Sequence, residues 1–176
     1  RLFAEGSFNA AFVPNYSSEL IKGKTKAKNF ANDVFNFLML GLLFLVILVE
    51  ILMPGFVYLI APGFYEDQSK LELTTLLTRI TFPFLLFISL ASFFSAILNS
   101  HNKFGVAAAA PIILNLILIF IIYLEKNSDD NLVIYLSYGV SIAGLIQLIF
   151  VYFFAKKYFL PTFDFKLKIT NKIKIF

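Results

Sequence analysis

Charged and aromatic side chains share one side of the helix that is predicted at the amino-terminus. At helical spacing, a single stripe of positions i, i+4, i+7 and i+11 holds Arg1, Glu5, Phe8 and Phe12. An arginine and a glutamate on a phenylalanine-rich wall suit an amphipathic ligand with an anionic head. The alternative for Arg1 is an ordinary arginine at the cytoplasmic end of a membrane helix. We expect Pro14 to end this helix.

A second pair of opposite charges falls within apolar stretches that predict membrane spans. At about 1.5 Å of rise per helical residue, Glu50 lies roughly 15 Å and Arg79 roughly 9 Å from the outer ends of their helices. We predict an ion pair between them, because each charge lowers the cost of removing the other from water. In the alternative, Arg79 extends to the membrane surface while Glu50 is protonated or faces a wet cavity. Pro54 and Pro83 predict kinks that free backbone carbonyls.

Groups that could support catalysis or metal binding are few. The single histidine, His101, falls in a short predicted turn, where we expect a solvated side chain. The acidic doublet Asp129-Asp130 lies in a polar loop without metal-ligand spacing around it. The chain contains no cysteine, which excludes disulfides and thiolate metal sites. Its sequence also lacks a glycine-rich phosphate loop and a nucleophile–base arrangement. We therefore predict that the protein is not an enzyme and has no catalytic residues, metal site or cofactor.

The elements that position these residues are predicted to be long apolar helices. Hydrophobic residues make up 59% of the chain and charged residues 15%, and the mean hydropathy of +0.82 exceeds that of a typical soluble domain. About 20 helical residues cross a hydrocarbon core of roughly 30 Å. The sequence predicts an all-α, polytopic membrane helical bundle with spans at residues 33–60, 73–99, 107–124 and 132–158. Residues 1–14 are expected to end a further transmembrane helix.

Lysine is distributed unevenly among the loops, and this distribution orients the predicted spans. Short cytoplasmic loops retain positive charge. We therefore place in the cytoplasm the basic loop 15–32, the turn around Lys103 and the linker 159–176. Loops 65–72 and 125–131 carry one lysine each and are expected on the outside. Because the cytoplasmic segments account for most of the positive charge, the net charge of +4 does not predict nucleic-acid binding.

Several polar and small residues within the spans are expected to join helices rather than to bind a ligand. We predict interhelical hydrogen bonds from Asn115 and Gln147. Small residues in the last span predict close packing against a neighbouring helix; these are Gly139, Ser141, Ala143 and Gly144.

The two ends of the sequence suggest a larger protein. The first residue is Arg1 rather than Met and lies inside a predicted helix. Near the other end, Thr170 and Asn171 offer an N-cap for a further helix. We expect the chain to be one part of a protein whose remaining helices contact it.

Several stretches of the chain, in order, resemble one family. The opening RLFAEGSFNAAFVP is similar to the signature R-x-F-A-E-G-A-F-x-x-A-F-V-P, with Ser7 in place of the commoner alanine. Residues 61–64 (APGF), 79–84 (RITFPF), 90–92 (LAS), 96–99 (AILN), 110–111 (AP) and 114–115 (LN) match further stretches. The resemblance is to the MurJ/MviN family, the bacterial lipid II flippases of the multidrug/oligosaccharidyl-lipid/polysaccharide exporter superfamily.

The resemblance implies a fold, a substrate and a location. The chain would be the end of helix two plus helices three to six of a fourteen-helix flippase fold. By alternating access, such a protein moves undecaprenyl-diphosphate carrying a disaccharide-pentapeptide across the bacterial cytoplasmic (inner) membrane, for peptidoglycan and cell wall biogenesis and thus cell shape. Its partners would be lipid II, membrane lipids and the remaining helices of the same protein.

The resemblance also implies roles for two residues. Arg1 matches an essential cavity arginine of the family, and Glu5 matches a glutamate for which we infer a cavity-lining or gating role, so both are candidate substrate-binding residues. An alternative is another exporter of the superfamily, for drugs or polyprenyl-linked glycans. A non-transporting membrane scaffold is a further alternative. A membrane-embedded transferase would need acidic or histidine clusters, which the sequence lacks.

Overall fold

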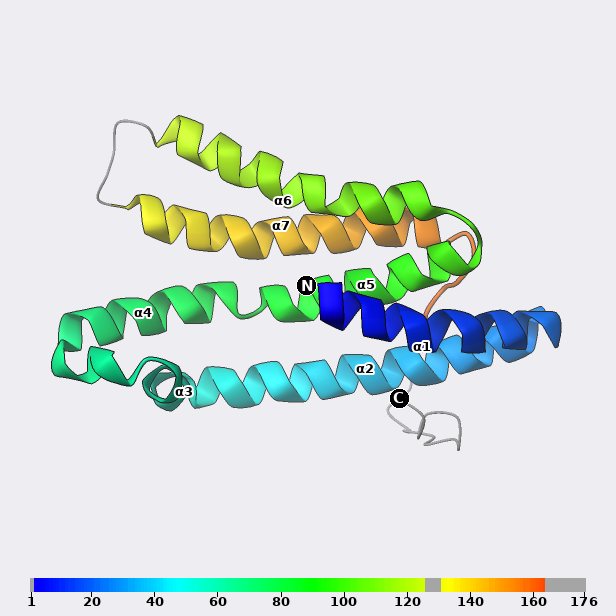
Figure 1. Ribbon diagram of the computed structural model, residues 1–176, viewed down its shortest axis with the longest axis horizontal. Coiled ribbons are helices and arrows are strands. Elements are labelled where there is room, and N and C mark those ends of the chain that lie inside the picture. Colours follow the sequence, from blue (N-terminus) through cyan, green and yellow to red (C-terminus); the bar gives the residue numbers. More distant parts are fainter. Residues whose placement is uncertain (1, 126–130, 164–176) are drawn as a thin grey trace. The chain divides into compact units, whose positions relative to one another are not determined.

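A computed structural model describes residues 2–125 and 131–163 of the protein, with side chains from residue 8 onward except Tyr65. This part is helical throughout, and its elements, in order, are α1 (Leu2–Ile21), α2 (Lys24–Ile51), α3 (Met53–Ile60), the 3-10 helix η1 (Pro62–Glu66), α4 (Gln68–Thr81), α5 (Phe84–Ser100), α6 (Phe104–Leu124) and α7 (Leu132–Ala155) (Figure 1). Four stretches are long and apolar enough to cross a membrane: Lys24–Ile51, Gln68–Ser100, Phe104–Leu124 and Leu132–Ala155. The predicted fold class is therefore confirmed.

The chain divides into two compact units, and four of its helices contribute residues to both. The first unit comprises Arg1–Gly41, Ser89–Ala110 and Leu148–Phe176, and the second comprises Leu42–Ile88 and Pro111–Gln147. The first unit contains the three basic segments of the sequence, and the second contains the two loops that are poor in lysine.

Phenylalanine side chains form the core of the first unit. Phe93 on α5 is fully buried and lies at the centre. Its ring centroid lies 5.3–6.3 Å from those of five other rings, which belong to Phe8, Phe12, Phe35, Phe94 and Phe159. Aromatic pairs at these separations add attraction beyond the area that they bury. The ring cluster thus joins α1, α2, α5 and the segment that follows α7.

Helix α1 continues past Pro14, so the predicted end of the helix at this residue is wrong. Pro14 is exposed and lies inside α1, which extends to Ile21. Pro14 lacks the N–H that would donate to the carbonyl of Ala10. At the next residue, the side chain of Asn15 donates to the carbonyl of Ala11 at 2.8 Å. Phe12 and Tyr16 stack on each other at 5.4 Å on either side of the proline, and both are buried. Packing of this aromatic stripe therefore outweighs the cost of the proline.

The predicted basic loop 15–32 is also wrong, since most of it is helical. Only Lys22 and Gly23 separate α1 from α2. Gly23 has φ +125°, a conformation that favours glycine. Ala27 and Phe30 on the first turns of α2 are buried. Lys24, Lys26 and Lys28 are exposed and therefore occupy the outer side of a packed helix rather than a loop.

In the second unit, two predicted spans are each divided into two helices. Residues 33–60 were expected to form one span, but α2 ends at Ile51 and α3 begins at Met53, with Pro54 in its first turn. Residues 73–99 were likewise expected to be continuous, but α4 ends at Thr81 and α5 begins at Phe84, directly after Pro83. The ribbon changes direction at both points (Figure 1). Proline disrupts the backbone hydrogen bonding that would continue each helix.

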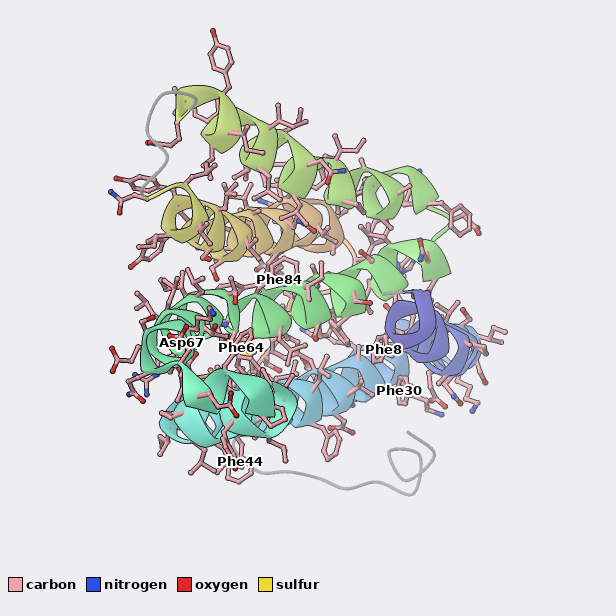
Figure 2. The ribbon with its side chains drawn as sticks, turned by 60° about the vertical axis from the view of Figure 1, so that its left-hand side comes forward. Phe8, Phe30, Phe44, Phe64, Asp67 and Phe84 are labelled. Atoms are coloured by element: carbon pink, nitrogen blue, oxygen red, sulfur yellow. The ribbon has the colours of Figure 1, made fainter. Side chains whose placement is uncertain are left out.

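Helices α6 and α7 keep nearly the predicted bounds of the last two spans, and α7 packs closely through its small residues. Pro111 lies inside α6 without interrupting it. A methyl group added at Gly144 would lie 2.6 Å from the ring of Phe84, which occupies the space between α5 and α7 (Figure 2). One added at Gly139 would overlap Ile121 of α6. The prediction that small residues let this span approach its neighbours is confirmed.

Large apolar side chains cover the outside of the spans. In this chain alone, Phe44 on α2 is 69% exposed and points outward (Figure 2). Phe120, Tyr123 and Phe153 are also exposed. A water-soluble domain rarely exposes contiguous apolar surface, whereas a membrane protein presents such surface to lipid or to further helices.

Candidate functional site

The amino-terminal stripe is packed rather than open where the structure describes it. Arg1 lies outside the described residues, and Glu5 lies on α1 with its side chain outside them. Phe8 and Phe12 stack at 5.5 Å, in agreement with the predicted shared side. Phe12, however, is fully buried against Phe30 and Phe93. Phe12 therefore anchors α1, the helix that carries Glu5, and its ring is not accessible to the ligand that the phenylalanine-rich stripe suggested.

His101 is not the solvated residue that we expected. It lies in the turn between α5 and α6 and stacks on Tyr158 with ring centroids 4.2 Å apart. The hydroxyl of Tyr16 on α1 lies 3.5 Å from its Nε2. Asn102, at φ +60°, closes the turn, and the backbone N–H of Lys103 donates to the carbonyl of Leu98. Burial lowers the pKa of His101 below its ordinary value, which favours the neutral ring.

The segment after α7 is bound to α2, an interaction that the sequence analysis missed. The side chain of Asn32 donates to Oγ1 of Thr162 at 2.7 Å and accepts from its backbone N–H at 3.0 Å. Asn36 donates to the carbonyl of Thr162 at 3.2 Å. Phe159 is 2% exposed and contacts Phe35 and Phe93. Residues 159–163 are therefore docked on α2 within the first unit. The spacing of Asn32 and Asn36, one helical turn apart, was the only signal for it.

Glu50 and Arg79 both lie in the second unit, within candidate spans. Among the described residues, direct salt bridges join Lys22 to Glu19 at 2.9 Å and Lys70 to Asp67 at 3.0 Å, whereas Glu50 and Arg79 form none. Oε1 of Glu50 is buried, and in the described part of the chain it has no hydrogen-bond partner. Arg79 is exposed. The direct ion pair therefore stays a prediction.

Both helix interruptions release backbone carbonyls near these charges. Proline has no N–H, and in a regular helix residues 54 and 83 would donate to the carbonyls of Glu50 and Arg79. The hydroxyl of Ser141 on α7 donates to the neighbouring carbonyl of Ile80. A hydroxyl from an adjacent helix thus satisfies one of the acceptors that the second interruption exposes.

Residues that could bind a metal ion do not come together in the part of the chain that the structure describes. No group of three or more His, Asp or Glu residues there could hold one. The Asp129-Asp130 doublet lies outside the described residues.

Comparison with known proteins identifies relatives over almost the whole chain. The family described as Lipid II flippase MurJ matches residues 1–175. "Probable lipid II flippase MurJ" of Rickettsia prowazekii (strain Madrid E) is 40% identical over 157 residues, which cover 89% of this chain and 31% of the relative. The protein of the same name from Rhizobium tropici is 45% identical over 157 residues, covering 86% and 30%. The Treponema pallidum (strain Nichols) protein is 38% identical over 163 residues, covering 86% and 30%.

The family match and the candidate spans together identify the family of this chain. The chain spans less than a third of the length of these curated relatives. Its four candidate spans make it a multi-pass membrane protein, and the family match extends through all of them. From these two findings we conclude that the chain belongs to the lipid II flippase MurJ family.

Proposed function

We propose that this chain is part of a flippase that moves lipid II, undecaprenyl-diphosphate carrying a disaccharide-pentapeptide, across the bacterial cytoplasmic membrane. The observation that carries the proposal is the family match over residues 1–175, together with four candidate spans in the same segment. The relatives bear the name "Probable lipid II flippase MurJ". This name favours lipid II over drugs or other glycans as the substrate.

The physical task is to carry a charged head group through hydrocarbon. Burying an uncompensated charge costs many kcal/mol, so a diphosphate with sugars does not cross a bilayer unaided. A wet cavity lined by arginine offsets this cost, because a guanidinium group forms paired hydrogen bonds with phosphate oxygens. Alternating exposure of such a cavity to the two sides moves the substrate without a chemical reaction.

In this proposal, Arg1 binds the diphosphate and Glu5 lines or gates the cavity. Glu5 lies on α1, which the aromatic core of the first unit holds through Phe12 and Tyr16, and Arg1 directly precedes this helix in the sequence. The three basic segments face the cytoplasm, and the remaining helices of the protein complete the transport path. The cargo and membrane lipids are its other partners.

Growth of a strain depleted of its own lipid II flippase tests this function. The complete gene product that carries this chain should restore growth, and Arg1→Ala should fail to do so while still inserting in the membrane. The matched control is Arg1→Lys, which keeps the charge that orients the helix but removes the planar fork that binds phosphate. Substrate binding predicts that Arg1→Lys also fails. Full rescue by Arg1→Lys would reduce Arg1 to an orienting charge, and failure of the unaltered protein would contradict the proposed function.

A further inference from the structure

The two helix interruptions in the second unit enclose one hairpin. This hairpin consists of α3, η1 and α4, and each of these three elements contacts the other two. It begins after Leu52, next to Pro54, and it ends at Phe82, next to Pro83. Continuous helical hydrogen bonding is therefore weakened at both points where the hairpin joins the rest of the second unit.

The two interruptions also lie against each other. The rings of Phe56 and Phe82 meet edge to face with centroids 5.8 Å apart. Phe56 lies two residues after one proline and Phe82 one residue before the other. Two weak points that are far apart in the sequence thus share one contact. This is the geometry of a hinge that the chain crosses twice, so that the hairpin turns as one rigid piece.

Opposite charges lie on the two sides of this hinge. Glu50 belongs to α2, before the first interruption, whereas Arg79 belongs to the hairpin, before the second. Each is four residues ahead of its proline. Among the described residues the two form no direct salt bridge, and Oε1 of Glu50 is buried without a hydrogen-bond partner there. Rotation of the hairpin would therefore change the separation of the two charges and the strength of their attraction.

Helix α7 contacts the chain on both sides of the second interruption. The hydroxyl of Ser141 donates to the carbonyl of Ile80, which belongs to the hairpin. One turn along α7, Gly144 lies against Phe84 of α5, beyond the hinge. The close contact at Gly144 fixes α5 against α7. On the other side of the hinge, a single hydrogen bond from Ser141 holds the hairpin, and this bond can break when the hairpin moves.

We propose that residues 53–81 form a hinged hairpin whose position is set by the attraction between Glu50 and Arg79. The hairpin acts as a gate on the side of the membrane that the loop 65–72 faces. This role adds to the proposed flippase function and rests on it. The gate is closed when Glu50 and Arg79 form a direct ion pair. The structure, in which the two charges are not in direct contact, is the open state. The prolines make the change possible because they remove the helical hydrogen bonds that would resist it.

Distance measurements between spin labels test the hinge directly. In the complete gene product with no other cysteine, labels can be attached at Phe44→Cys on α2 and Leu59→Cys on α3, which are 69% and 78% exposed. The distance between the labels is measured in the complete gene product, in lipid nanodiscs without substrate. Glu50→Gln should shift the distance distribution away from that of the protein with both charges. The exchanged pair Glu50→Arg with Arg79→Glu should return it toward the original. Pro54→Ala with Pro83→Ala should narrow the distribution, because both helices gain backbone hydrogen bonds.

The matched control is Pro111→Ala, because Pro111 lies inside α6 without interrupting it. This change should leave the distribution unaltered. The hinge is contradicted if Glu50→Gln has no effect, if the exchanged pair behaves like Glu50→Gln, or if the two proline changes have no more effect than the control. The readout does not depend on transport. A shifting hairpin in a protein that fails to rescue growth would overturn the proposed function alone, and a static hairpin in a protein that rescues growth would overturn the hinge alone.

Discussion

In the first unit, packed phenylalanine rings fill the space between helices, whereas in the second unit helices are interrupted at prolines and carry opposite charges within apolar stretches. Among the described residues, the buried hydrophobic residues of the second unit are only Val46, Met53, Val57 and Ala143. The first unit also holds side-chain hydrogen bonds between distant segments, at Asn32 and Thr162 and at Tyr16 and His101. The difference teaches that one region of this chain is built to hold its geometry and the other to change it.

The largest expected effect breaks the core of the first unit. Phe93→Ala removes the ring at the centre of the aromatic cluster and should lower the free energy of unfolding by about 3–5 kcal/mol. Thermal unfolding of the purified protein in detergent would measure the loss. The matched control, Phe44→Ala, removes an outward-facing ring and should change stability little. Equal losses for the two changes would contradict the contrast between core and lipid-facing surface.

A smaller effect is expected from overpacking the second unit. In Gly144→Ala the new methyl group meets the ring of Phe84 at 2.6 Å and the Cβ of Phe87 at 3.3 Å, and overpacking of this kind costs about 1–3 kcal/mol. The same unfolding measurement would detect it. Gly41 has nothing within 4 Å of an added methyl group, so Gly41→Ala should be neutral or stabilising, because alanine favours the helix. A Gly144→Ala protein as stable as the original would mean that α5 and α7 separate easily.

The docked segment after α7 sharpens the comparison further. Asn32→Ala removes two hydrogen bonds to Thr162, and net losses of this kind are about 1 kcal/mol each. Limited proteolysis near residue 162 should become faster. Asn29→Ala changes an exposed asparagine on the same helix and provides the control. Unchanged proteolysis in Asn32→Ala would show that Phe159 and the hydrogen bond from Asn36 hold the segment without Asn32.

The smallest expected effect is a pH dependence of the first unit. Because burial holds the pKa of His101 below its ordinary value of 6.5, the unfolded chain binds a proton more readily than the folded one. The contribution of the neutral ring to stability is complete above pH 6.5 and is lost as the pH falls from this value through the lower pKa of the folded protein. Melting temperatures measured from pH 8 to pH 5 should decline more in the original protein than in His101→Asn. Parallel declines would contradict the effect.

The sequence predicted the helical class and the four spans, because apolar length alone determines them. It predicted the close packing at Gly139 and Gly144 for the same local reason, since small residues permit close approach. The predictions that were wrong concern residues whose structure is set by tertiary contacts rather than by the local sequence. Pro14 remains inside α1 because Phe12 and Tyr16 pack on both sides of it, and His101 is stacked because Tyr158 arrives from more than fifty residues away.

The candidate site was predictable in its residue types but not in its geometry. The sequence identified Glu50 and Arg79 as charges within spans, and helix spacing placed each one turn before a proline. It did not indicate that Phe56 and Phe82 bring the two interruptions together, because no local pattern encodes a contact between rings 26 positions apart. Arg1 and Glu5 stay predictions that rest on the family match.

Side-specific labelling tests the central claim most directly, namely that the lysine-rich segments and the lysine-poor loops face opposite sides of the membrane. Lys24→Cys and Asp129→Cys would be introduced one at a time into the complete gene product with no other cysteine. Each variant would then be treated with a membrane-impermeant maleimide. We predict that residue 129 reacts in intact cells and that residue 24 reacts only after the membrane is permeabilised. Reaction of both residues from the same side would contradict the orientation, and with it the transport path proposed for lipid II.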